Sequence, residues 1–194
     1  MRNVGFIVGS LRKGAYTRLM SQAACELAPA SLKLTEIGIG DLPFYNQDLE
    51  TDTPPAQWVS FRNQVRDCDA VLFITPEYNR GLPAALKNAI DVGSRPRKES
   101  VWRGRPAAVI SMSPGQLGGM AANHQLRLCL SVIGMLVMPA PEMYVSNAGD
   151  LFDGGGKLSN DDMRRRVSSM LADFDTWIGR FAPSPQPLSQ GERG

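Results

Sequence analysis

A basic loop near the amino terminus contains residue types that suit the binding of an anion. Residues 9–18 read GSLRKGAYTR, so the loop supplies hydroxyl groups from Ser10 and Thr17 and positive charge from Arg12 and Lys13. The loop joins an apolar run to a segment of helical periodicity, and unpaired backbone N–H groups at the start of a helix favour negative charge. This pattern predicts the binding of a phosphate monoester.

Two common phosphate-binding loops do not match this segment. A P-loop requires Lys and then Ser or Thr after its second glycine, but Ala15 and Tyr16 follow Gly14. The G-x-G-x-x-G pattern of dinucleotide-binding folds is not supplied by the spacing of Gly5, Gly9 and Gly14. Taken alone, the loop leaves two interpretations open, a phosphate site and an ordinary basic turn between a strand and a helix.

Two further loops follow apolar runs and carry groups that suit a flat, polar ring. Residues 75–91 read TPEYNRGLPAALKNAID, and residues 111–119 read SMSPGQLGG. The first offers the aromatic face of Tyr78 and backbone N–H groups after a proline turn. The second offers the hydroxyl of Ser113 and glycines that permit a close approach of the backbone. The alternatives are an ordinary turn in the first loop and a flexible helix entry in the second.

These loops together resemble the NADPH-dependent FMN reductase family, which includes bacterial quinone and chromate reductases. The resemblance is carried by the runs PEYN at 76–79 and LKNAID at 86–91, and by a segment at 113–119 similar to the family's S-x-G-x-x-G-G. It extends over residues 4–148 with the motifs in the family's order. It implies an NAD(P)H-dependent oxidoreductase that uses FMN.

The resemblance also implies where FMN lies. Its phosphate is expected at the loop 10–17 and its ring between the PEYN run and Ser113. The residues expected to hold the cofactor are Ser10, Leu11, Arg12, Lys13, Gly14, Ala15, Tyr16, Thr17, Pro76, Glu77, Tyr78, Asn79 and Ser113. No catalytic side chain and no metal ligand are expected, because the cofactor carries the chemistry.

The implied reaction is a ping-pong transfer of electrons through FMN. NADPH or NADH gives a hydride to the flavin, and a quinone, free flavin, chromate or azo compound then takes the electrons in the same place. The family also implies a homodimer or homotetramer in which a neighbouring subunit helps to close each flavin pocket. The sequence leaves open the physiological acceptor and the choice between the two nicotinamides.

The chain departs from the family pattern at four residues. Ala15 stands where relatives often have Ser, and Thr17 stands where they often have Asn. One side-chain hydrogen bond to the phosphate is therefore expected to be lost, and Thr17 is expected to replace the other. Met120 and Ala121 stand where relatives often have an Arg after the double glycine, which leaves open any subunit contact that depends on that Arg.

The elements that position these loops follow from periodicity. Unbroken apolar runs predict strands buried on both faces, and segments of helical spacing separate them. We expect strands at 4–8, 32–37, 69–75, 107–111 and 135–138, and helices at 15–28, 56–66, from Pro83, from Gly118-Gly119, and at 160–180 with Ser159 as cap. This alternation predicts an α/β, flavodoxin-like doubly wound fold, with a five-stranded parallel sheet of order 2-1-3-4-5 and helices on both faces.

The chain is expected to form one FMN-binding domain over residues 1–182, followed by a disordered tail over 183–194 that is rich in Pro, Ser and Gln. A net charge of +2 gives no indication of nucleic-acid binding. No apolar stretch approaches the roughly 20 residues of a membrane helix, and no signal-peptide pattern precedes the first strand. We therefore expect a cytoplasmic protein that binds neither nucleic acid nor membranes.

Several other residues are expected to have no chemical role. Cys25, Cys68 and Cys129 are too few and too widely spaced for a disulfide framework or a metal cluster, so buried, unpaired thiols are expected. His124 is the only histidine, which excludes a Ser-His-Asp triad or a multi-histidine metal site. We expect it to have a structural or interface role.

Two other classes of protein share this fold. A flavodoxin-type electron carrier has no substrate of its own, but such carriers are strongly acidic and this chain has a pI near 8.5. A non-flavin binding module on the same fold is the second alternative. The colour of the purified protein and its turnover of NADPH with a quinone distinguish these classes from an FMN-dependent reductase.

Overall fold

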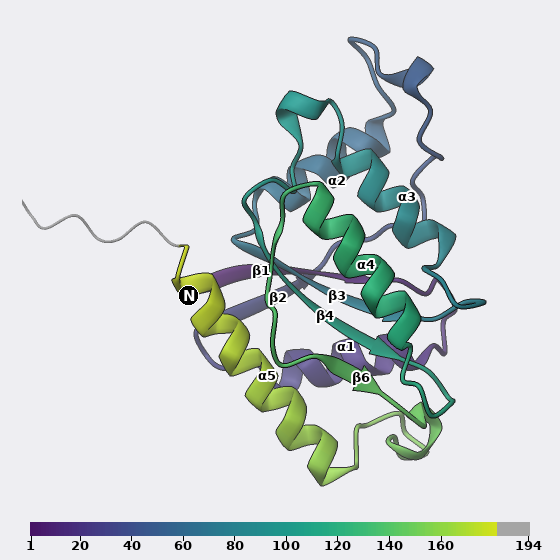
Figure 1. Ribbon diagram of the computed structural model, residues 1–194, viewed down its shortest axis with the longest axis vertical. Coiled ribbons are helices and arrows are strands. Elements are labelled where there is room, and N and C mark those ends of the chain that lie inside the picture. The colour runs from purple at the N-terminus through teal and green to yellow at the C-terminus, as the bar shows by residue number, and fades with distance from the viewer. Residues whose placement is uncertain (182–194) are drawn as a thin grey trace, which may run out of the picture.

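A computed structural model describes residues 1–181 and shows helices on both faces of one parallel sheet (Figure 1). The strands are β1 (Arg2–Val8), β2 (Leu32–Glu36), β3 (Ala70–Pro76), β4 (Pro106–Met112), β5 (Leu136–Val137) and β6 (Met143–Val145). The α-helices are α1 (Tyr16–Leu27), α2 (Ala56–Arg66), α3 (Ala84–Gly93), α4 (Met120–Val132) and α5 (Asp161–Gly179). Short 3₁₀ turns lie at Gln47–Leu49, Arg97–Glu99 and Ala148–Asp150.

The strand order is β2-β1-β3-β4-β5, and each paired strand runs parallel to its neighbour. The predicted fold class and order are therefore confirmed. The fifth position differs from the prediction because two short strands share it: β5 pairs with the start of β4, and β6 pairs with its end. Pro139 and Pro141 lie between them, and proline has no N–H to donate to a sheet ladder, so pairing stops and resumes at Met143.

The two faces of the sheet are covered by different helices. Val4, Phe6 and Val8 of β1 pack in a core with α1 and α5. Ile7, between them in sequence, packs in a second core with α2, α3 and α4. Figure 1 shows the same division, with α1 and α5 below the sheet and the other three helices above it. Both faces of the central strands are thus buried, which explains their unbroken apolar sequences.

The start of α5 corrects one expected cap. Asn160, not Ser159, is the N-cap residue, and its side-chain oxygen accepts a hydrogen bond of 2.9 Å from the Met163 amide. Ser159 instead donates its hydroxyl to the Leu151 carbonyl at 3.4 Å. The acidic residues Asp161 and Asp162 then occupy the first turn, where the helix dipole favours them.

The cysteines are free within the described residues, but the expectation of burial is wrong for Cys25, which is exposed. Cys68 and Cys129 are half-buried. Partial burial raises the pKa of all three thiols above the ordinary value, so they remain protonated near neutral pH. The helical periodicity of α1 explains this exposure. Ala23 and Ala24 face inward and are buried, whereas Cys25 lies on the outward side of the helix.

Two other expectations concern the membrane and the tail. Among residues 1–181, no helix is both long enough and apolar enough to span a membrane. The predicted disordered tail, residues 183–194, lies outside the described residues, as does the last position of the predicted domain 1–182.

The core of α5 generates a test of the fold. Phe174 is fully buried against the sheet, whereas Phe44 is 77% exposed in the connection after β2. Phe174→Ala is expected to lower the free energy of unfolding by about 3–5 kcal/mol, because it removes a packed ring and leaves a cavity. Phe44→Ala is the matched control and is expected to change it by less than about 0.5 kcal/mol. Urea denaturation followed by circular dichroism measures both, and equal effects would contradict the described core.

Candidate functional site

Three loops meet at the carboxyl ends of the central strands. The sheet register sets Val8 opposite Ile74 and Thr75 opposite Ser111, so the chain leaves β1, β3 and β4 at neighbouring points. The loops enclose a cavity of about 260 Å³. Its lining residues are Ser10, Arg12, Ala15, Tyr16, Thr17, Pro76, Glu77, Tyr78, Met112, Ser113 and Pro114. The chain adds β2 on one side of β1 and then β3 on the other side, so the direction of strand order changes between β1 and β3. The cavity lies at this switch point, which is the usual ligand position in such sheets.

The lining brings together most of the residues that the sequence singled out. Nine of the thirteen predicted residues line the cavity, while Leu11, Lys13, Gly14 and Asn79 do not. Met112 and Pro114 line it and were not predicted. A signal for both was available, because they flank Ser113 at the end of a buried strand, where the ligand edge of the sheet begins.

The amino end of α1 forms one wall and has donors without protein partners. Ala15 occupies the N-cap position, no side chain caps the helix, and its first turn contains no acidic residue. The hydroxyl of Thr17 is buried and has no hydrogen-bond partner among the described residues. Buried hydroxyls are normally paired, so an unpaired one beside an uncapped helix start indicates a ligand that accepts hydrogen bonds.

One hydrogen bond and one positively charged side chain further define this end of the cavity. The hydroxyls of Ser10 and Tyr78 lie 3.0 Å apart and link the first loop to the second. Arg12 lines the cavity, and no ion pair holds its guanidinium within the part of the chain that the structure describes. The wall therefore combines a helix N-terminus, hydroxyl groups and an unpaired cation, which together favour a phosphate group.

The second wall is a tight turn in an unusual backbone conformation. Tyr78 and Gly81 exchange backbone hydrogen bonds of 3.0 and 2.9 Å. Asn79 and Arg80, between them, have φ angles of 51° and 64°. Asn tolerates this left-handed region, but Arg adopts it rarely, and the Arg80 guanidinium is held by the Glu77 carboxylate at 2.9 Å. The geometry thus fixes Tyr78, half of whose surface is exposed, at the mouth of the cavity.

The third wall corrects the expectation for the double glycine. Gly118 and Gly119 have φ angles of 59° and 74°. A Cβ on Gly118 would lie 2.7 Å from the Tyr144 backbone, and one on Gly119 would lie 3.2 Å from the Met112 amide. The glycines therefore allow this loop to pack against β6 and β4, not against a ligand. Ser113 remains at the cavity, with its hydroxyl donating to Gly115 at 3.1 Å.

The residues present fit the phosphate of FMN, and the cavity is too small to enclose the whole cofactor. Unpaired donors at α1 match a phosphoryl group, and Tyr78 offers an aromatic face next to them. The cavity of about 260 Å³ is smaller than the roughly 300–1,000 Å³ of pockets that enclose a small molecule. A ligand as large as FMN must therefore keep part of its surface open to solvent or to another molecule.

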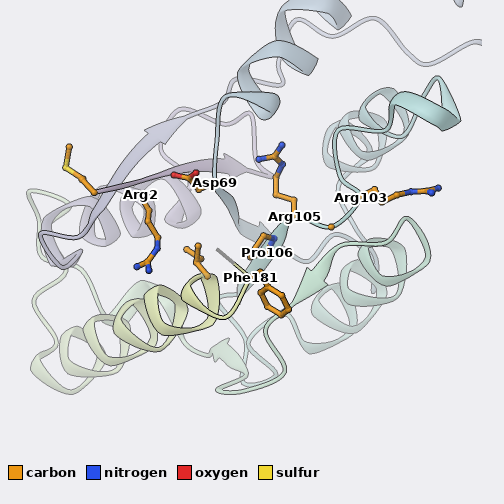
Figure 2. Close-up of a pocket in the computed structure, with 9 residues that line it drawn as sticks. Arg2, Asp69, Arg103, Arg105, Pro106 and Phe181 are labelled. Atoms are coloured by element: carbon orange, nitrogen blue, oxygen red, sulfur yellow. The ribbon is translucent and has the colours of Figure 1, made fainter. Parts of the chain in front are cut away.

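A second pocket, of about 430 Å³, lies at the amino ends of β1, β3 and β4. Arg2, Arg103 and Arg105 line it, which suggests an anion site at first sight. Figure 2 shows that these three side chains point in different directions and do not converge. Arg2 is moreover paired with Asp175. This pocket therefore lacks a focused set of donors, unlike the cavity at the carboxyl ends of the strands.

His124 lies away from the cavity lining. Its Nε2 is 2.9 Å from the Tyr144 hydroxyl, and the two rings are tilted against each other. Burial and the neighbouring Glu142 raise the pKa of Tyr144 to about 12. This tyrosine consequently stays protonated at neutral pH and can donate to the imidazole. Over residues 1–181, no group of three or more His, Cys, Asp or Glu side chains could hold a metal ion.

Comparison with known proteins gives consistent results. Residues 2–150 match the profile of the NADPH-dependent FMN reductase family. A quinone reductase of Pseudomonas putida is 50% identical over 176 residues, covering 91% of this chain and 94% of the relative. An NAD(P)H-dependent FMN reductase of Pseudomonas aeruginosa is 37% identical and covers 90% and 94%. The solved structure of FerB, a flavoenzyme NAD(P)H:(acceptor) oxidoreductase from Paracoccus denitrificans, is 35% identical with a TM-score of 0.87, covering 93% and 99%.

The unpaired hydroxyl of Thr17 generates a test with effects of opposite sign. Thr17→Val keeps the shape of the side chain and removes the buried polar group, so it is expected to stabilise the ligand-free protein by about 1 kcal/mol. The same change is expected to weaken FMN binding about tenfold, because it removes a donor to the phosphate. Chemical denaturation and titration of FMN fluorescence measure the two effects.

Thr75 supplies the matched control for stability. It is also fully buried, but its hydroxyl donates to the Pro76 carbonyl at 2.8 Å. Thr75→Val is therefore expected to destabilise the ligand-free protein by about 1 kcal/mol. A destabilised Thr17→Val variant would show that its hydroxyl has a protein partner after all.

Proposed function

Because this chain belongs to the NADPH-dependent FMN reductase family, it is an NAD(P)H-dependent FMN or quinone reductase, and we propose that it works with FMN bound at the carboxyl ends of β1, β3 and β4. The observation that carries the binding site is the buried, unpaired Thr17 hydroxyl beside the uncapped start of α1. An anionic group placed there accepts hydrogen bonds from the Thr17 hydroxyl and from the backbone N–H groups at the start of α1.

The proposed division of roles follows the three walls. Ser10, Arg12 and the start of α1 at Ala15, Tyr16 and Thr17 hold the phosphate. Pro76, Glu77, Tyr78 and Ser113 form the walls beside the flavin ring. Leu11, Lys13, Gly14 and Asn79, which lie outside the cavity lining, flank the site and shape its rim. Bound FMN supplies the redox chemistry, because it takes a hydride from NADPH or NADH and gives electrons to the acceptor.

The open side of the cavity determines which molecules can react. Tyr78 lines the cavity and is 49% exposed, so aromatic surface borders its open side. Flat aromatic molecules bind such surface by stacking and by removing it from water. We propose that nicotinamide and acceptor use this face in turn, which is a ping-pong scheme. Quinones are the proposed acceptors, with free flavin, chromate or azo compounds as further small acceptors that such an open face admits.

We propose that the protein forms a homodimer or homotetramer through α4. Met120, Leu128 and Val132 recur at multiples of four residues, which places them along one ridge of the helix. Leu128 and Val132 are 71% and 81% exposed, an unusual state for large apolar side chains on neighbouring turns. The ridge begins at Met120, the first residue after the loop that carries the cavity residues Ser113 and Pro114, so we place a neighbouring subunit on α4 near the proposed flavin site. We also propose a cytoplasmic location, where NAD(P)H is available.

Charge at the phosphate wall generates the first test of this proposal. Arg12 lines the cavity, and its neighbour Lys13 does not. Arg12→Gln is expected to weaken FMN binding about tenfold, because it removes a charged hydrogen bond to the phosphate. Lys13→Gln, which removes the same charge one residue away, is expected to weaken binding less than about twofold. Fluorescence titration measures both dissociation constants, and equal losses would contradict the assigned wall.

The wild-type protein tests the function itself. We expect it to be yellow when saturated with FMN and to oxidise NADPH or NADH with a quinone and no other protein present. Bound FMN without turnover would favour an electron carrier of the flavodoxin type. A colourless protein that does not quench FMN fluorescence would favour a non-flavin binding module.

The apolar ridge of α4 generates a test of self-association. Leu128→Glu places a charge at the centre of the ridge and is expected to shift the oligomer to monomers, because burying an unpaired charge is costly. Val59→Glu, at a 40% exposed position on α2, is the matched control and is expected to keep the wild-type mass. Size-exclusion chromatography with light scattering measures the mass, and an unchanged mass for Leu128→Glu would exclude this ridge.

A further inference from the structure

We propose that Glu77 is a positioning residue that fastens the Tyr78 turn to the amino end of α4 and thereby fixes two walls of the FMN site as one unit. This inference rests on the proposed binding of FMN at that site. It assigns Glu77 a role different from direct contact with the cofactor.

Both carboxylate oxygens of Glu77 are already occupied by protein groups. Oε2 accepts a hydrogen bond of 3.1 Å from the Ala122 amide, and Oε1 accepts one of 2.9 Å from the Arg80 guanidinium. The Glu77 side chain is only 9% exposed. Each carboxylate oxygen therefore has a protein donor, one from α4 and one from the turn itself.

The contact with Ala122 supplies a cap that α4 does not provide for itself. Gly119 is the N-cap residue, it has no side chain to accept a bond, and the first turn of α4 contains no acidic residue. Ala122 is fully buried, so water is excluded from its side of the helix. A carboxylate at this point satisfies an otherwise unpaired N–H group and interacts favourably with the helix dipole.

A second contact fastens the far end of the same turn to α4. The side-chain oxygen of Gln125 accepts a hydrogen bond of 2.8 Å from the Leu82 amide. Ala122 and Gln125 are three residues apart and therefore lie on the same side of α4. The segment 77–82 is thus held at both ends against a single helix, which helps to maintain the left-handed conformations of Asn79 and Arg80 between them.

The amino end of α4 also joins the loop that carries Ser113, which forms the third wall of the cavity. This loop runs directly into α4 through Gly118 and Gly119, which pack closely against the backbones of Tyr144 and Met112. Motion of the α4 amino end would therefore shift the Ser113 wall, and release of Glu77 would loosen the Tyr78 wall from it and leave the Gln125–Leu82 contact to hold the turn to α4. The relative position of the two walls thus depends on Glu77, with Gln125 as the second fastening.

Three variants separate this role from the alternatives. Glu77→Gln keeps an oxygen for the Ala122 amide and removes the charge. Arg80→Ala removes the ion pair and keeps the carboxylate on the helix. Glu77→Ala removes both contacts. We expect Glu77→Ala to raise the FMN dissociation constant about tenfold and to broaden the visible absorption bands of bound FMN, while Glu77→Gln and Arg80→Ala stay within about threefold of wild type.

Arg2→Ala controls for a general loss of stability. It breaks the pair between Arg2 and Asp175 at the amino end of β1, away from the cavity. We expect it to lower the thermal midpoint without changing the FMN dissociation constant or spectrum. If Glu77→Gln or Arg80→Ala binds FMN as weakly as Glu77→Ala, charge or the ion pair is the essential element and the proposal is overturned. Unchanged FMN binding in Glu77→Ala overturns it as well.

Amide hydrogen exchange in the ligand-free protein makes the test independent of FMN. We expect exchange at the Ala122 amide to be at least about tenfold faster in Glu77→Ala than in wild type, and near wild type in Glu77→Gln. Equal exchange in all three proteins overturns the proposed contact. A wild-type protein that shows this exchange pattern but does not bind FMN would contradict the proposed function while leaving the link between the turn and α4 intact.

Discussion

Burying the Thr17 hydroxyl without a partner costs the ligand-free protein about 1–3 kcal/mol, and the proposed binding site rests on this cost. The uncapped start of α1 lies next to this hydroxyl. Its N-cap residue is Ala15, although Ser, Thr, Asp or Asn is normally found at such a position. A phosphoryl group can satisfy both deficits at once. The rest of the fold serves to place this helix start against the loops after β3 and β4.

The site also concentrates strain in its second wall. Arg80 is held in the left-handed region, and left-handed backbone at a residue other than glycine costs about 1–3 kcal/mol. The pairing of Glu77 with Arg80 and with the α4 amide offsets that cost. Rigid walls suit the proposed role of FMN, because a cofactor that carries the reaction needs from the protein orientation and one open face.

The sequence predicted the central sheet well, since apolar runs such as 70–75 and 107–111 are buried on both faces and carry a strong signal. It also predicted three loops that the structure brings together. It could not predict that the fifth position is split, because a two-residue strand has no detectable periodicity. The packing of Gly118 against β6 and the contact of Glu77 with α4 depend on distant segments, which residue spacing does not encode. The exposure of Cys25, by contrast, agrees with the helical spacing of α1 and could have been predicted.

The split between β5 and β6 bears on how copies of this chain can associate. A long outer strand would present a regular row of free amides and carbonyls, a template for edge-to-edge aggregation. Here that border of the sheet is broken into pieces of two and three residues. The opposite border, β2, is only five residues long and includes charged Lys33 and Glu36. Neither border suits continuous strand addition, so stacking into fibrils is disfavoured, and contact between copies is left to the helical faces.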